Sequence, residues 1–321
     1  MMGMFTLLRF VTPAVSRSIP PAIVIVLWSL PVAAAPLEVK QSDGAVSVVS
    51  EGRPVFVYLS DKVPFKPYVQ QFFSPGGFNV LRDNVPDHVH HHGLMFALGV
   101  NGVSFWAEAP DSGHEVHKSI EVLPSSTKDG IQRAGFSGQV EWQDPKGAVL
   151  LNEQRTVLAL QVGKAEPPVS FLTWESRLLA PPGKESVELS GSHYYGLGLR
   201  FPQSMDAIGT FFNASGNPGE VVRGDERNLP AAWCAYTAAP EGKSVTLAAF
   251  GHPDNVRGPA TWFTMANPFA YMSATLNLHK EPLKLTADKP LVLRYAVAVW
   301  DGKIEASQID MLYQVWLTLS K

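Results

Sequence analysis

Short runs of β-branched and aromatic residues, separated by turn dipeptides, constrain the fold of this 321-residue chain more than any other feature. Ala45–Val49 and Pro54–Leu59 are two such runs, and Asp-Gly at 43–44 and Glu-Gly at 51–52 bound them as hairpin turns. Comparable runs recur to Trp300, about a dozen in all, with Gly and Pro turns between them. This pattern predicts an all-β protein.

The run Val169–Leu179 alternates between two faces of a strand. Leu172, Trp174 and Leu178 fall on one face, whereas Glu175 and Arg177 fall on the other. Two interpretations of the polar face stay open: an ion pair on a solvated surface, or the polar floor of a groove.

One helix is expected at the end of the chain. Ser307 is its predicted N-cap, with Asp310 in the capping-box position. An apolar stripe at three- and four-residue spacing follows, formed by Ile309, Leu312, Trp316 and Leu319. Together with the strands, this predicts a single domain over residues 36–321: a large antiparallel β-sandwich with a C-terminal helix.

Residues 1–35 have the features of a signal peptide. Arg9 and Arg17 precede an apolar run at 19–32, and three alanines follow at 33–35. The run is shorter than the roughly 20 apolar residues of a membrane span. We therefore expect cleavage, a periplasmic or secreted protein, and no stable membrane span after cleavage.

Net charge and cysteine content exclude some classes of protein. The net charge is −3, without the basic stripes of a nucleic-acid-binding protein. Cys234 is the single cysteine, so an internal disulfide is excluded, and its apolar neighbours predict a buried hydrophobic side chain.

Four of the nine histidines fall within five positions, in the segment Asp87-His-Val-His-His-His-Gly93. Arg82 lies just upstream, and an apolar run at 94–98 follows. Imidazoles titrate near neutral pH, and loops held by a rigid sheet often carry chemistry. Asn-Gly at 101–102 predicts a hairpin that brings Glu108 back toward the same end. A functional site is therefore expected here.

Several segments resemble a secreted bacterial family labelled "methane oxygenase PmoA" and otherwise of unknown function: 66–68, 79–83, 87–94 and 100–106, with Asn267-Pro-Phe269 and Trp300-Asp-Gly302. The usual motif of that family is Asp-His-Pro-His-His-Arg-Gly. Here Val89 replaces the proline and His92 replaces the arginine. Methane oxidation is not a credible activity, because a membrane methane monooxygenase subunit needs several spanning helices.

The histidine loop, Phe-Trp at 105–106 and His-Tyr-Tyr at 193–195 are also similar to galactose mutarotase-type enzymes. This resemblance implies a β-supersandwich and a sugar substrate. The positions matching the sugar-flanking residues are Arg82, His91 or His92, and His193. The late carboxylate that serves as base corresponds to Glu281. Because unrelated reactions share this sandwich, the resemblance does not define the reaction.

The first hypothesis is an exported carbohydrate-active enzyme, a lyase, hydrolase or epimerase, that uses acid–base chemistry. Its predicted catalytic residues are His91, His193, Glu108 and Glu281. Its predicted substrate-binding residues are Arg82, His92, Trp106, Tyr194 and Arg200. The expected partner is a carbohydrate small molecule or glycan.

Two alternatives stay open. In the first, the loop binds a divalent metal, zinc, copper or iron, with Asp87 or Glu108 as an oxygen ligand. An extended loop would project His88, His90 and His92 to one side, but the arginine of the family motif favours His88, His90 and His91. In the second, the protein binds a glycan without turning it over, and the histidines are structural.

Overall fold

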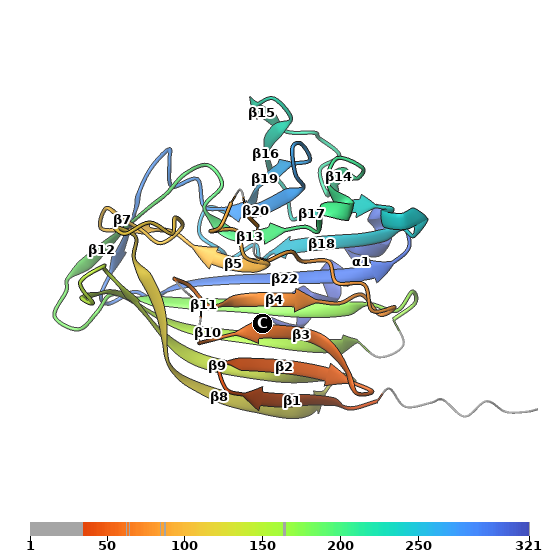
Figure 1. The fold of residues 1–321 in the computed structure, drawn as a ribbon, viewed down its shortest axis with the longest axis horizontal. Helices are drawn as coiled ribbons and strands as arrows, with labels where there is room; N and C mark the ends of the chain where they lie inside the picture. Colours follow the sequence, from red (N-terminus) through yellow and green to blue (C-terminus); the bar gives the residue numbers. More distant parts are fainter. Residues whose placement is uncertain are drawn as a thin grey trace, which may run out of the picture. The chain divides into compact units, whose positions relative to one another are not determined.

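The computed structural model describes residues 35–61, 63, 65–83, 85–86, 88–162 and 165–320. Three antiparallel sheets make up this part of the chain (Figure 1). The first has ten strands in the spatial order β1 (Leu37–Ser42), β2 (Ala45–Ser50), β3 (Arg53–Leu59), β4 (Tyr68–Phe72), β5 (Leu94–Ala97), β13 (Gly196–Arg200), β20 (Tyr271–Thr275), β19 (Thr261–Met265), β16 (Glu226–Pro230) and β15 (Glu220–Arg223).

The second sheet has eight strands, β14 (Thr210–Asn213), β17 (Trp233–Ala238), β18 (Val245–Gly251), β22 (Leu291–Asp301), β11 (Ser170–Leu179), β10 (Val149–Val162), β9 (Ile131–Gln143) and β8 (His114–Lys128). A small sheet contains β21 (Leu283–Thr286), β12 (Ser186–Ser190), β6 (Gly99–Val100) and β7 (Val103–Ser104). Short 3₁₀ turns occur at Gln203–Met205 and Pro240–Gly242. These sheets, with one helix at the C-terminal end of the described chain, confirm the predicted fold class.

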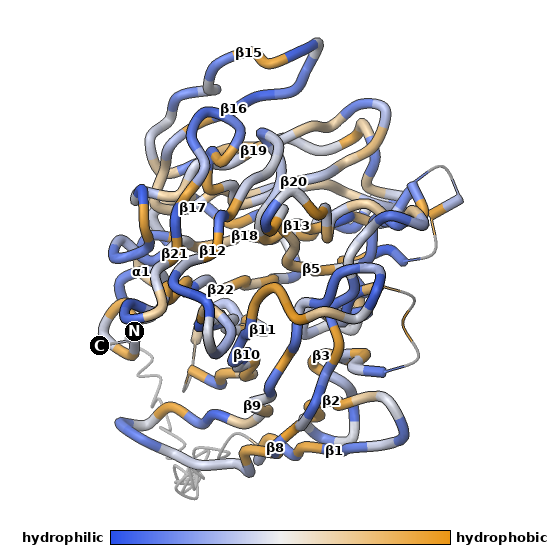
Figure 2. Tube along the Cα trace, turned by 90° about the vertical axis from the view of Figure 1, so that its left-hand side faces the viewer, coloured by the Kyte–Doolittle hydropathy of each residue, from blue (hydrophilic) through white to orange (hydrophobic). Residues whose placement is uncertain are grey.

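Alternation along β11 determines which residues enter the core between the two larger sheets. Leu172, Trp174 and Leu178 are at most 1% exposed, as the pattern predicts. The hydrophobic segments of the trace run along the strands, and the β15–β16 hairpin projects beyond them (Figure 2). Burial of the inward faces supplies most of the stabilisation, at about 25 cal/mol per Å² of apolar surface.

A charged group lies inside this core and connects the sheets. Arg155 on β10 is fully buried; its Nη2 donates to Glu115 at 2.8 Å and to Glu153 at 2.7 Å, and its Nη1 donates to the Tyr58 hydroxyl of β3 at 3.1 Å. Burial raises the pKa of Glu115 to about 8, although Arg155 opposes the rise. Burial also opposes the charge on Glu153, but its interactions with Arg155, Ser176 and Trp142 outweigh this effect and lower its pKa.

The helix α1 (Ala306–Leu319) covers the outer face of the eight-stranded sheet. Ile309, Leu312 and Trp316 are buried against it, as predicted. The predicted N-cap is wrong: Glu305 occupies that position and forms a capping box with Gln308. The predicted capping-box residue, Asp310, instead accepts a hydrogen bond from Trp233 Nε1 at 2.6 Å, because it faces the sheet.

Two segments differ from their predicted structures. The run at 94–100 divides at Leu98, so that β5 belongs to the ten-stranded sheet and β6 to the small one. The Asn101-Gly102 turn is present, with φ of 49° and 82°. The polar composition of the segment at 213–227, with its Gly, Pro, Glu and Asp residues, predicts an excursion over the surface, but the segment contains β15 and the start of β16.

Candidate functional site

A pocket of about 560 Å³ lies beside the histidine loop. Three parts of the chain line it: the loop itself, the β15–β16 turn, and the β19–β20 region with Tyr194. The lining residues are His88, His90, His91, Tyr194, Arg223, Gly224, Asp225, Glu226, Phe263, Met265, Asn267, Pro268, Phe269 and Tyr271. Segments far apart in the sequence therefore converge on one cavity, as a ligand site requires.

The histidine loop is a turn, not an extended segment. The His91 N–H donates to the His88 carbonyl at 2.8 Å. The His91 ring lies 4.8 Å from that of His88 and 4.6 Å from that of His90, measured between ring centroids. The extended geometry behind a His88, His90 and His92 trio is therefore wrong, because the turn directs His92 elsewhere.

A metal site on His88, His90 and His91 stays a prediction. Their rings stack on or lie edge-to-face with one another. No group of three or more His, Cys, Asp or Glu side chains in the described ranges is placed to hold a metal ion. Asp87, the suggested oxygen ligand, lies outside the described residues.

His90 and His91 are neutral at physiological pH. Burial, followed by the neighbouring histidines, lowers the pKa of His91 to about 2. Burial and Lys66 lower that of His90 to about 4. The His91 ring stacks on Tyr271 with 5.1 Å between centroids, and its Nδ1 meets no hydrogen-bond partner among the described residues. A neutral imidazole with an unused ring nitrogen can donate a proton to a ligand or accept one from it.

Glu226 is a buried pocket carboxylate that sequence reasoning missed. It is 5% exposed, and its Oε1 accepts a hydrogen bond from Arg223 Nη2 at 2.6 Å. Its Oε2 is buried and makes no hydrogen bond within the described chain. It lies 3.9 Å from His193 Nε2, which is longer than a hydrogen bond. Glu226 is the first residue of β16; it lies opposite Arg223 of β15, and the next residue, Arg227, begins the pairing with β19.

His193, predicted to be catalytic, lies at the edge of this pocket. Its ring is 4.9 Å from that of Tyr194 and 5.3 Å from that of Phe263, and both of those residues line the cavity. Burial lowers its pKa, although Glu226 opposes the change. Of the predicted site residues, His91 and Tyr194 therefore line this pocket, and His193 lies beside it.

His92 and Glu108 instead form a buried network on the other side of the loop. The two ring nitrogens of His92 lie 2.8 Å from Asp83 Oδ1 and 2.8 Å from Glu108 Oε1. Lys66 Nζ donates to the same Glu108 oxygen at 2.7 Å, and the Tyr68 hydroxyl donates to Asp83 at 2.6 Å. Ionised carboxylates only accept hydrogen bonds, so both His92 nitrogens must donate and the ring is an imidazolium.

The pKa values of His92 and Glu108 agree with an ion pair between these two residues, whereas burial lowers the pKa of Lys66 although Glu108 opposes the change. Burial opposes charge on His92, but the hydrogen bonds to Asp83 and Glu108 outweigh it and raise the His92 pKa. Burial likewise opposes charge on Glu108, but His92 and Lys66 lower its pKa overall. Glu108 thus reaches the histidine loop, as the hairpin predicted, but neither it nor His92 lines the pocket.

The remaining predicted residues lie around the pocket rather than in it. Arg82 and Arg200 line a neighbouring cavity of about 350 Å³ that shares Pro268 and Phe269 with the first. The Arg200 guanidinium lies 3.5 Å from the centroid of the Phe269 ring. Arg82 lies 3.8 Å from Asp206. Phe269 therefore separates these two arginines from the histidines.

Trp106 and Glu281 are not placed to contact a ligand in the pocket. Trp106 is 2% exposed and stacks on Tyr195 with 4.9 Å between centroids, so it supports the pocket from behind. The Glu281 side chain is 82% exposed and pairs with Arg257 at 3.7 Å. A solvated surface turn gives no support to its predicted catalytic role.

Fold and pocket together define an antiparallel β-sandwich protein with a ligand-sized cavity at the edge of its ten-stranded sheet. The sequence matches DUF6807, a family of unknown function, over residues 45–314, and the chain belongs to that family. The match carries no methane oxygenase label. No curated protein matches the sequence.

Solved structures with a similar fold include two GH36 α-galactosidases from Geobacillus stearothermophilus. AgaA is 10% identical with a TM-score of 0.42, covering 83% of this chain and 40% of that one. AgaB is 10% identical with a TM-score of 0.45, covering 82% and 39%. This chain thus spans about two fifths of the α-galactosidase chains. Among the described residues, no helix has the length and apolar character needed to cross a membrane.

Proposed function

We propose that this protein binds a carbohydrate in the pocket beside the histidine loop and carries out acid–base chemistry on it. The observation that supports this most is that neutral His91 and the buried carboxylate Glu226 line the same cavity. The two residues come from different parts of the chain, the histidine loop and the β15–β16 turn. A sugar hydroxyl or ring carbon between them would meet one group that accepts a proton and another that returns it.

The rest of the lining suits a sugar. Phe263, Phe269 and Tyr271 offer apolar surface for the C–H face of a ring, and His90 and Asn267 offer hydrogen bonds to hydroxyls. Glu226 is the proposed base, because its Oε2 has no hydrogen-bond partner in the described chain. His193, 3.9 Å away, is proposed to orient the carboxylate and to exchange its proton with solvent. Lyase, epimerase and hydrolase reactions all use such a pair.

Export to the periplasm or the outside of the cell is part of the same proposal. It rests on the N-terminal sequence, which lies outside the described residues. An extracellular location suits a protein that acts on glycans.

The test is a screen of neutral and acidic mono- and oligosaccharides, with binding followed by calorimetry and turnover by chromatography. Once a substrate is found, we expect Glu226→Gln and His91→Ala to lower turnover about 10²- to 10⁴-fold while the protein stays folded. Glu281→Gln, a carboxylate change outside the pocket, should leave turnover unchanged. Equal turnover in all three variants contradicts the proposal. Binding without turnover supports instead a non-catalytic glycan-binding protein.

A further inference from the structure

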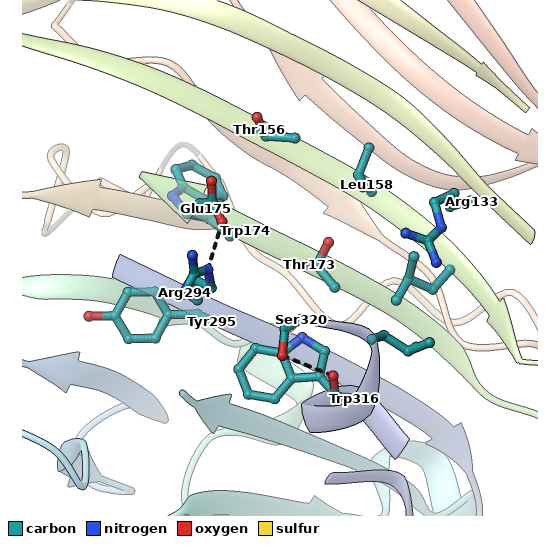
Figure 3. A pocket seen from close by; sticks show the side chains of 12 residues that line it. Arg133, Thr156, Leu158, Thr173, Trp174, Glu175, Arg294, Tyr295, Trp316 and Ser320 are labelled. Carbon is teal, nitrogen blue, oxygen red and sulfur yellow. Dashed lines mark hydrogen bonds and ion pairs between the residues drawn. The ribbon is translucent and has the colours of Figure 1, made fainter. Parts of the chain in front are cut away.

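A second concave site lies on the outer face of the eight-stranded sheet, against the last turn of α1 (Figure 3). It has a volume of about 340 Å³, and its floor comes from the adjacent strands β9, β10, β11 and β22. No residue lines both this groove and the pocket beside the histidine loop. The groove is therefore a separate cavity with its own lining chemistry.

One end of the groove carries a row of polar side chains. Thr156, Glu175 and Arg294 lie directly opposite one another on three neighbouring strands. Arg294 Nε donates to Glu175 at 2.9 Å, as Figure 3 shows, and the two side chains remain 33% and 43% exposed. Glu175 thus pairs with Arg294 instead of Arg177, and it lines a groove. A half-exposed guanidinium–carboxylate pair offers both donors and acceptors to sugar hydroxyls.

The other end carries Arg133, which has no carboxylate partner in the described part of the chain. Its Nε is buried and meets no hydrogen-bond acceptor among the described residues. Arg133 on β9 lies opposite Leu160 on β10, which lies opposite Phe171 on β11. Phe171 is four residues from Glu175 along the same strand. Four residues of strand span roughly 13 Å, so the two guanidinium groups serve opposite ends of an elongated ligand. A buried donor without an acceptor is costly unless an acceptor arrives.

Between these ends the floor is mixed. Leu158 and Thr173 lie opposite each other at its centre, and Trp316 closes the side formed by α1. The groove holds two guanidinium groups against one carboxylate, so its lining is net positive. An anionic group fits Arg133, an apolar ring face fits Leu158, and hydroxyls fit Thr173 and the Glu175–Arg294 pair.

We propose that this groove binds an acidic saccharide, with a uronate carboxylate on Arg133 and the hydroxyls of the next sugar on the Glu175–Arg294 row. A guanidinium binds a carboxylate through parallel hydrogen bonds, which a neutral sugar cannot provide. The site goes beyond the proposed activity: it would hold an acidic glycan apart from the pocket where chemistry takes place.

Calorimetric titration of the whole protein with trigalacturonate tests this inference. We expect saturable binding by the wild type and weaker binding of the fully methyl-esterified trimer, which has lost its charges. Arg133→Met should weaken trigalacturonate binding on the order of tenfold or more, the worth of a charge-assisted hydrogen bond. Arg133→Lys, which keeps the charge, should bind between the two. The matched control is Arg177→Met. Arg177 is an exposed arginine of β11 on the same face of the sheet as Glu175, and it does not line the groove.

Several outcomes would overturn the inference: no saturable binding by the wild type, equal binding of acid and ester, or unchanged affinity in Arg133→Met. Glu226→Gln separates this site from the pocket. If Glu226→Gln abolishes binding and Arg133→Met does not, the ligand occupies the pocket, so the groove inference fails and the proposed function gains support. If only Arg133→Met weakens binding, the groove is the site whether or not the pocket is catalytic.

Discussion

His91 and His92 are neighbours in the sequence and nearly equal in burial, at 6% and 5% exposed, yet their pKa values move in opposite directions. His91 lies among aromatic rings and other imidazoles, so nothing compensates for the loss of water around a charge. His92 lies between two carboxylates, which compensate for it. Burial alone therefore does not determine the charge of a loop histidine; the hydrogen-bond partner does.

This difference divides the loop into two sides. The pocket side has groups with unused hydrogen-bonding capacity, such as His91 Nδ1 and Glu226 Oε2. On the network side, Glu108 pairs with Lys66 and His92, and His92 also pairs with Asp83. We conclude that the network holds the loop in place and that the pocket side is available for a ligand. Substitutions on the network side should affect stability first.

Of the substitutions on the network side, Glu108→Ala is expected to lower the unfolding free energy most. It leaves the fully buried Lys66 ammonium and the His92 imidazolium without the carboxylate they share. Breaking a buried ion pair by removing one partner costs about 3–5 kcal/mol of unfolding free energy. Urea unfolding followed by circular dichroism measures this change.

Glu281→Ala is the matched control, because it removes a carboxylate from an exposed pair with Arg257. Exposed pairs contribute about 0–1 kcal/mol, so its unfolding free energy should stay close to that of the wild type. Equal losses in the two variants would mean that the network does not stabilise the loop.

The second largest expected effect is a pH dependence of folding stability, which the titration of His92 causes. Because folding raises its pKa, its stabilisation is complete below about pH 6.5 and is lost as the pH rises through the folded value. His92→Gln should cost about 1–3 kcal/mol at pH 6 and show a smaller fall in stability at higher pH. Glu115, whose pKa is about 8, titrates in the same range in both proteins and cancels in the difference.

Histidine resonances in NMR spectra report the same contrast directly. His92 should remain protonated above pH 6.5, whereas His91 should remain neutral down to pH 4. Two histidines that titrate together near pH 6.5 would contradict the division of the loop into two sides.

Local sequence patterns predicted the features that depend on neighbours in the chain. Alternation placed Trp174 in the core, the Asn101-Gly102 turn brought Glu108 to the histidine loop, and the apolar stripe located the helix. Glu226 was missed because its sequence neighbours are polar, whereas its strand, β16, joins the ten-stranded sheet through β19, which lies far along the chain. Glu281 was chosen for its late position alone, and sequence order does not specify which turn reaches the pocket.

The smallest expected effect tests whether the site of His92 requires a cation or a histidine. Arginine is charged at every accessible pH, whereas histidine titrates. His92→Arg should therefore keep the unfolding free energy within about 1 kcal/mol of the wild type at pH 6, because its guanidinium can bind Asp83 and Glu108. It should also lose the fall in stability above pH 6.5, since no group at this position then titrates. If His92→Arg were as unstable as His92→Gln in urea unfolding, the network would depend on the shape of the imidazole, which stacks on Tyr68 at 4.5 Å, and not on its charge.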